Sequence, residues 1–193
     1  MCPSSHPLQR PFAQQLQNCE QYLALDSKLP AILRGETSPT NPGEALTLAQ
    51  MCQEHKKRHV AAARLFADAF AAEPKLAADL NQQYRYNAAC SAALAAAGEG
   101  EDARSLPDKV VTMFRHWALS WLRADLTAYA KLAERPDPAA RQSVRQRLAH
   151  WQSDAGLASV RAKEALAELP EGEAGDWRKL WAEVDAFRQR AAR

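Results

Sequence analysis

Residues Glu44 to Gly98 read EALTLAQMCQEHKKRHVAAARLFADAFAAEPKLAADLNQQYRYNAACSAALAAAG. Alanine and other small residues recur in this stretch at helical spacing, aromatic side chains stand among them, and Pro74 closes the first pair of helices. Small residues let helices approach each other closely, as the stacked hairpins of an α-solenoid require. The stretch therefore predicts a scaffold, and it contains no group of residues that indicates a particular reaction or ligand.

The composition of the whole chain argues against an electrostatic function. Its 193 residues carry a formal net charge of +2, and 25% of them are charged, with both signs interleaved. A chain of this length buries a core of useful size, most simply as one domain. A net charge this small is not that of a polyanion binder, so nucleic acid is not an expected partner.

The cysteines and the apolar residues bear on the compartment. Four cysteines are widely scattered, without a disulfide framework or a Cys-x-x-Cys motif, at positions Cys2, Cys19, Cys52 and Cys90. We interpret them as reduced thiols. The sequence shows no apolar core of a secretory signal and no apolar run of bilayer length. We therefore expect a soluble cytoplasmic protein that does not enter a membrane.

The N-terminal part of the chain is predicted to hold helices over residues 9–35, followed by a linker. Apolar residues at i, i+4, i+7 and i+11 give the first helix one stripe, formed by Phe12, Leu16, Cys19 and Leu23. This helix is expected to end near Asp26, and a short helical turn from Lys28 to Arg34 is expected to stop at Gly35.

Residues 41–98 are predicted to form helical hairpins. Asn41 is placed as the N-cap of the first helix, with Pro42 at the first helical position. The next helix begins near His59 and ends at Pro74. The expected buried positions of the hairpins are Leu48, Cys52, Ala62, Phe66, Ala69, Phe70, Tyr86, Ala89, Cys90, Ala93, Leu94 and Ala97.

Residues 105–193 are predicted to form a long helix and a C-terminal helical cap. Ser105 to Asp108 resembles a capping box that starts the long helix, and Asp137 with Pro138 starts the next one. Buried positions are expected at Val110, Phe114, Trp117, Trp121, Ala128 and Leu132 of the long helix, and at Val144, Leu148, Trp151, Trp177, Leu180, Trp181, Val184 and Phe187 of the cap. The five tryptophans are interpreted as core. With no period of two, the whole chain (1–193) is predicted to be a single all-α domain.

Two sets of motifs carry a resemblance to known proteins. Residues 52–74 are similar to a tetratricopeptide repeat, with Ala62, Phe66, Ala69 and Pro74 at the second-helix positions of that motif. Beyond it, residues 86–90, 121–126, 150–152 and 177–181 resemble the C-terminal helical region of planctomycete-type serine/threonine protein kinases. The resemblance implies a tetratricopeptide-like array, a short α-solenoid with a C-terminal helical cap.

The kinase domain of that family is absent from this sequence. No Gly-rich phosphate loop follows a strand, and no Val-Ala-Ile-Lys, His-Arg-Asp or Asp-Phe-Gly motif is present. We therefore expect no catalytic residue and no cofactor, and a noncatalytic scaffold that recognises a peptide or helix of a partner protein. The alternative is a regulatory or substrate-recruiting arm of a serine/threonine kinase.

The expected partner-binding residues are Tyr84, Arg85 and Asn87, with Lys56 in support. In tetratricopeptide arrays, Asn and basic residues on the first helix of a hairpin hold the backbone or carboxylate of an extended peptide. Asn87 matches that role by position. The competing interpretation is that Asn87 only bonds a neighbouring helix end.

A weaker hypothesis is a metal or nucleic-acid site in the first hairpin. Cys52, His55 and His59 fall at i, i+3 and i+7, a spacing at which a thiolate and two imidazoles can share one helix face. The positive charges of residues 56–58 disfavour a cation there. The same basic cluster lacks an aromatic platform for bases, so a solvated helix end is the favoured interpretation.

Overall fold

The computed structural model describes the backbone of residues 9–190 and the side chains of residues 20–189. Every regular element in that part of the chain is helical, which confirms the predicted all-α class. The helices cluster into two compact units, residues 1–40 and residues 41–193, which are described one at a time. That the chain is a single domain stays a prediction.

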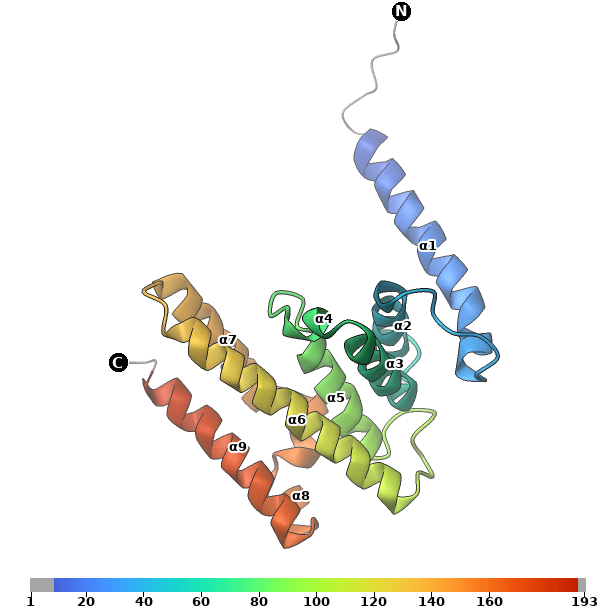
Figure 1. Cartoon of the computed structure of the whole chain (residues 1–193). Coiled ribbons are helices and arrows are strands. Elements are labelled where there is room, and N and C mark those ends of the chain that lie inside the picture. The colour runs from blue at the N-terminus through green and yellow to red at the C-terminus, as the bar shows by residue number, and fades with distance from the viewer. Residues whose placement is uncertain (1–8, 191–193) are drawn as a thin grey trace, which may run out of the picture. The chain divides into compact units, whose positions relative to one another are not determined.

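The first unit holds one long helix, α1 (Gln9–Leu33; blue in Figure 1). The predicted break after Asp26, with a separate helical turn behind it, is wrong. The helix continues through Pro30, whose φ angle is compatible with a helix and whose missing N–H removes one backbone hydrogen bond near the helix end. The Arg34 N–H then donates to the Pro30 carbonyl at 3.2 Å, and the helix ends before Gly35, as predicted.

The apolar stripe predicted for α1 falls largely outside the described side chains. Phe12, Leu16 and Cys19 lie there, and Cys2 lies outside the described residues altogether. Leu23, the last member of the stripe, is 69% exposed, and its neighbour Tyr22 is also exposed. The described part of α1 therefore has apolar side chains on its surface.

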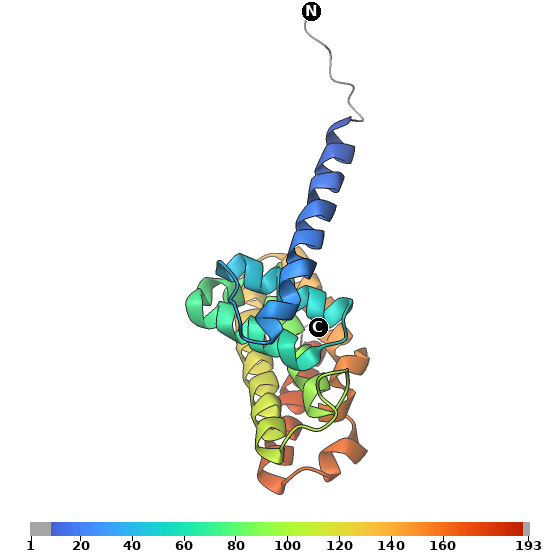
Figure 2. The ribbon, with the colours of Figure 1, turned by 90° about the vertical axis from the view of Figure 1, so that its right-hand side faces the viewer.

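The second unit begins with a succession of antiparallel helices. It contains α2 (Pro42–Glu54), α3 (His59–Ala72), the short α4 (Pro74–Ala78) and α5 (Tyr84–Ala96). α2 packs on α3, and α3 packs on α5. Figures 1 and 2 show these helices from two sides. Alanines at the contacts allow this close approach.

Four α-helices and one 3-10 helix complete the described part of the second unit. They are α6 (Asp108–Ala133), α7 (Pro138–Ser153), α8 (Lys163–Ala167) and α9 (Glu171–Arg190), with a 3-10 helix, η1 (Ala155–Val160), between α7 and α8. α6 packs along α5, and both α7 and α9 pack on α6. α9 runs beside α6 in Figure 1 (red beside yellow).

The helix starts test the predicted caps. The Asn41 side-chain oxygen accepts a hydrogen bond from the Glu44 N–H at 2.9 Å, and the Asp137 carboxylate accepts one from the Ala139 N–H at 2.9 Å, so both predicted N-caps are confirmed. The capping box at Ser105 is wrong. Pro107, in extended conformation, takes the N-cap position of α6 without a side-chain cap, which leaves Ser105 two residues too early.

The buried face of α6 differs from the predicted one. Phe114 is buried as predicted, but the other fully buried positions follow at Ala118, Leu122 and Tyr129. The predicted Val110, Trp117, Trp121, Ala128 and Leu132 are only half-buried. The face is rotated because it includes Asp125, a charged residue that an apolar pattern does not count. Ala97, also predicted to point inward, is exposed because α5 ends at Ala96.

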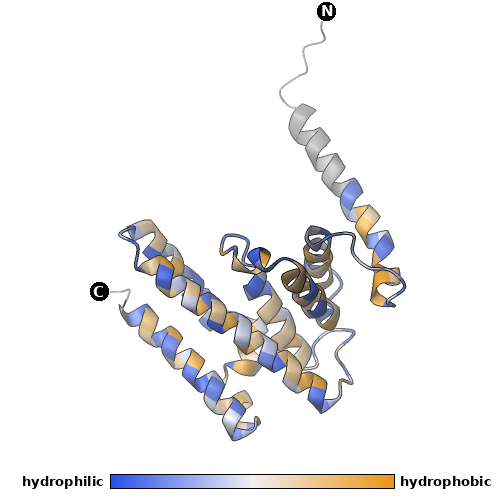
Figure 3. Ribbon diagram, in the orientation of Figure 1, coloured by the Kyte–Doolittle hydropathy of each residue, from blue (hydrophilic) through white to orange (hydrophobic). Residues whose placement is uncertain are grey.

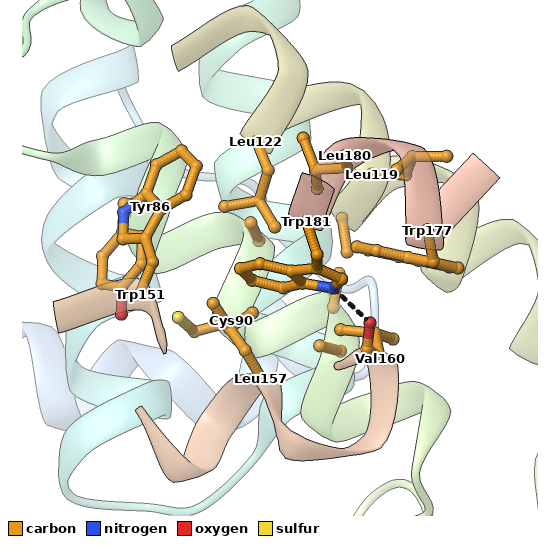
Figure 4. Packing of buried hydrophobic residues seen from close by; sticks show 14 of the residues in the cluster. Tyr86, Cys90, Leu119, Leu122, Trp151, Leu157, Val160, Trp177, Leu180 and Trp181 are labelled. Atoms are coloured by element: carbon orange, nitrogen blue, oxygen red, sulfur yellow. Dashed lines mark hydrogen bonds between the residues drawn. The ribbon is translucent and has the colours of Figure 1, made fainter. Parts of the chain in front are cut away.

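The remaining core predictions are largely confirmed. Leu48, Cys52, Ala62 and Phe66 are fully buried. So are the cap residues Val144, Leu148, Trp151, Trp177, Leu180 and Val184. Figure 4 shows Trp151 and Trp181 near Cys90, and Trp177 near Leu119. The Trp181 indole N–H donates to the Val160 carbonyl at 2.7 Å. Three of the five tryptophans are therefore buried in this core.

The turn between α2 and α3 is held by the loop between α5 and α6. The Asp102 carboxylate accepts hydrogen bonds from the first N–H groups of α3, those of Val60 and Ala61, at 3.2 and 3.0 Å. Gly100, at φ +96°, approaches so closely that a Cβ there would lie 2.4 Å from the Lys57 carbonyl oxygen. This contact buries His59 beneath the loop.

The burial of His59 predicts a pH dependence of folding. Burial lowers its pKa; Asp102 and Glu99 oppose this shift, and Lys57 adds to it. Because the unfolded chain binds a proton at the higher pKa, of about 6.5, this contribution to stability is present above that pH and is lost as the pH falls. We expect urea unfolding midpoints, measured between about pH 7.5 and about pH 5.5, to fall more steeply for wild type than for His59→Gln. Equal slopes would contradict the prediction.

Candidate functional site

The predicted partner-binding residues lie on the second unit, but one of them is engaged inside the protein. Tyr84 and Asn87 are half-buried on α5, and Lys56 follows α2. The Asn87 carbonyl accepts hydrogen bonds from the Gln53 side chain at 3.3 Å and the Ser91 hydroxyl at 3.0 Å.

The Arg85 guanidinium donates to Asp125 at 2.7 Å. A partner carboxylate would have to compete with Asp125 for Arg85.

Arg85 belongs to a polar network that joins α5, α6 and α7. Asp125 is 1% exposed, and the Arg85 side chain is 14% exposed. Burial raises the pKa of Asp125, and the nearby guanidinium groups of Arg85 and Arg147 oppose that shift. Arg147 also lies over the Tyr129 ring, 5.9 Å from its centre, and donates to the Leu80 carbonyl. The network is therefore a structural connection between three helices.

The weak metal candidates do not form a metal site. Cys52 is fully buried in α2, His55 is an exposed residue at the end of that helix, and His59 is buried at the start of α3. Among the residues that the structure describes, no three His, Cys, Asp or Glu side chains are grouped so as to hold a metal ion.

A second polar cluster surrounds Asp154, between α7 and η1. Its carboxylate accepts hydrogen bonds from the Tyr86 hydroxyl and from the Gly156 N–H, the latter at 2.8 Å. The Cys90 sulfur lies 3.7 Å and the His150 Nε2 3.6 Å from the same carboxylate. Cys, His and Asp together are a possible nucleophilic arrangement. Here, however, burial and the nearby Asp154 raise the pKa of the Cys90 thiol, so the thiol stays protonated. The cluster is therefore better suited to fixing η1 against α5.

A groove between α7 and α9 is a large hollow in the described surface. It has a volume of about 800 Å³, and we call it the α7–α9 groove. Its lining is polar and rich in arginine and glutamine: Pro138, Arg141, Gln142, Arg145, Gln146, Ala149, Asp185, Arg188 and Gln189. Arg141 and Arg145 lie one turn apart on α7, at the edge of the face that holds the buried Val144 and Leu148.

The electrostatics of the α7–α9 groove favour an anionic occupant. Within residues 20–189, no ion pair joins a carboxylate to Arg141, Arg145 or Arg188. Asp185 is the one acidic residue among the described lining residues, and its carboxylate accepts a hydrogen bond from Gln152. Arg141 donates one hydrogen bond to the Arg135 carbonyl at 3.5 Å, which leaves most of its donors for a ligand. Three guanidinium groups without a carboxylate partner therefore line the groove, a typical arrangement for binding carboxylates.

The chain was also compared with known proteins. No family model, curated protein or solved structure matches it. The resemblance to tetratricopeptide-containing kinases thus stays a prediction. Within residues 9–190, every helix is too short or too polar to cross a bilayer.

The sequence gives part of the signal for the α7–α9 groove. Arg141 and Arg145, with the glutamines that follow them, form the polar face of an amphipathic helix, and such faces are usually solvated. Only the antiparallel pairing of α7 with α9 brings Arg188 opposite them. Arg188 lies 43 residues from Arg145, so helical periodicity cannot predict that they meet.

Proposed function

We propose that this chain is a noncatalytic protein–protein interaction module that recognises a helix or peptide of a partner. The α7–α9 groove carries the proposal, because it is an open channel between two helices, about 800 Å³ in volume, with hydrogen-bond donors along it. Helix-in-groove binding is a common mode of peptide recognition. The successive packing of α2 on α3, α3 on α5 and α5 on α6 is consistent with a tetratricopeptide-like scaffold.

The groove is a better binding site than the hairpin surface expected from the sequence. On α5 the alanine face is buried, and the Arg85 guanidinium is bound to Asp125. The groove residues Gln142, Gln146 and Arg145 are instead exposed. In this proposal the helices from α2 to α6 form a rigid platform, and the C-terminal helical cap makes the contact with the partner.

The test is to fill the groove without changing its charge. Gln146→Trp places an indole in the groove, and Gln82→Trp makes the same exchange at an exposed site outside the lining. Each tagged chain is used to capture proteins from a lysate of the source cells, and the captured proteins are quantified by mass spectrometry. We expect the wild-type and Gln82→Trp chains to capture the same partner protein, and we expect the Gln146→Trp chain not to capture it. Equal capture by all three chains, or none, would contradict the proposal.

A further inference from the structure

The α7–α9 groove has a neighbouring groove along α9. A second groove, about 620 Å³ in volume, lies between α8 and α9, and Asp185 lines both. Its lining combines apolar side chains with cations: Arg161, Lys163, Leu166, Ala167, Arg178, Trp181, Ala182 and Asp185. The α9 residues that line the two grooves recur every three or four positions, so they form one stripe of the helix. We call the combined surface the α9 tract.

The two halves of the α9 tract differ in chemistry. The half beside α7 has Arg141, Arg145 and Arg188 without a carboxylate partner in the described part of the chain. The half beside α8 has an apolar floor made by Leu166 and Trp181. Figure 3 shows hydrophilic and hydrophobic residues alternating along α9. A ligand that fills the tract therefore needs negative charge along its length and an apolar group at the end beside α8.

The apolar half is preformed. The Trp181 indole is fixed by its hydrogen bond to the Val160 carbonyl at 2.7 Å, and the Arg161 guanidinium lies 5.9 Å from the centre of its ring. Arg161 is itself held by the carbonyls of Trp151 and Asp154, at 2.8 and 2.7 Å. Binding therefore requires little ordering of this end of the tract, which favours affinity.

We infer that the α9 tract binds an acidic amphipathic helix of a partner protein. This inference rests on the proposed interaction function. From Arg178 to Gln189 the stripe is about 17 Å long at 1.5 Å per residue, which is the length of about three turns of a bound helix. Glutamate or aspartate side chains one turn apart face Arg141 and Arg145, and an apolar side chain packs on Leu166 and Trp181.

The lining favours a protein partner over a nucleic acid. None of the described residues that line the α7–α9 groove is aromatic, so unpaired bases would find no stacking platform among these arginines. The net charge of the chain is only +2, whereas a nucleic-acid site normally extends over a large basic surface. A carboxylate-rich helix needs only the three arginines and the apolar floor that the tract supplies.

The inference is tested with a synthetic probe. The probe is a short fluorescein-labelled helical peptide with glutamates one turn apart on one face and leucines on the adjacent face; a matched peptide has glutamine in place of every glutamate. Binding to the full chain is measured by fluorescence anisotropy at low and at physiological salt. The charge variant is Arg145→Gln with Arg188→Gln. The control variant, Arg64→Gln with Arg104→Gln, removes the same charge from exposed positions outside the tract.

We expect wild type and the control variant to bind the glutamate peptide equally, and the charge variant to bind it at least about tenfold more weakly. The glutamine peptide should bind weakly to all three chains, and added salt should weaken the glutamate complex. Equal binding by the charge variant, no binding by wild type, or tighter binding of a single-stranded DNA of similar length would overturn the inference. If Gln146→Trp abolishes partner capture while the charge variant does not, the proposed function stands and only the acidic partner is wrong.

Discussion

Replacing Arg85 with methionine will lower the free energy of unfolding by about 3–5 kcal/mol, the usual cost of removing one partner of a buried ion pair. Asp125 is 1% exposed, and Arg85 donates to it at 2.7 Å. Without the guanidinium, the Asp125 carboxylate would be left in the core with Arg147 as its nearest opposing charge. Urea denaturation of Arg85→Met and wild type, followed by circular dichroism, measures the loss.

A matched double variant separates the charge from the packing. Arg85→Met with Asp125→Leu replaces both members of the pair by apolar side chains, and such replacements are often neutral or stabilising. We expect most of the lost stability to return. The loss in Arg85→Met should also shrink as the pH falls, because burial raises the pKa of Asp125 and a protonated carboxyl needs no ionic partner. A loss below about 1 kcal/mol would show that the pair behaves like a surface ion pair.

The features that the sequence predicts correctly depend on neighbouring residues. The cap of α2 needs only Asn41, Pro42 and a backbone N–H three residues away, so it forms wherever that sequence starts a helix. The same holds for Asp137 at the start of α7. The buried residues of α3 and α9 recur at three-to-four spacing, so helical periodicity predicts these faces.

The features that the sequence does not predict depend on contacts between distant residues. α6 packs on α5, α7 and α9, and the charged Asp125 lies on its buried face because Arg85 neutralises it from another helix. Trp121 lies at the edge of that face, its ring 5.9 Å from the Phe70 ring in an edge-on contact. The large indole side chains lead the sequence pattern to predict the wrong buried face for α6, because an indole loses much of its exposed surface even at the edge of a helix contact.

The candidate site depends even more than the core on contacts between distant residues. The sequence predicts partner binding by Lys56, Tyr84, Arg85 and Asn87, because polar residues on the first helix of a hairpin typically bind peptides. The structure shows that Arg85 instead pairs with Asp125 within the fold. The arginines of the α7–α9 groove become a candidate only once α9 is seen beside α7. Polar side chains on a helix face carry no local signal of what lies opposite them.

Replacing Asp154 with alanine will lower the free energy of unfolding by about 2–4 kcal/mol, because buried donors left without an acceptor cost about 1–3 kcal/mol each. The Tyr86 hydroxyl and the Gly156 N–H both lose their acceptor, and η1 loses its cap. Tyr86→Phe keeps the ring stacked on Trp151, 5.8 Å away, and removes only the hydroxyl. In a double-mutant cycle measured by urea denaturation, Asp154→Ala should therefore cost less stability in the Tyr86→Phe background than in wild type. Additive effects of the two substitutions would show that the hydrogen bond contributes no coupling.

The pH dependence of the same variant gives an independent test. Burial alone would raise the pKa of Asp154, but the hydrogen bonds from Tyr86 and Gly156, with His150 nearby, lower it below its ordinary value. The ionised form is thus favoured in the folded chain, so its contribution is present above the unfolded pKa, of about 3.9, and is lost as the pH falls through the folded pKa. The difference in stability between wild type and Asp154→Ala should therefore narrow in acid. A difference that stays constant from neutral pH into acid would mean that Asp154 stabilises the fold through packing rather than through its charge.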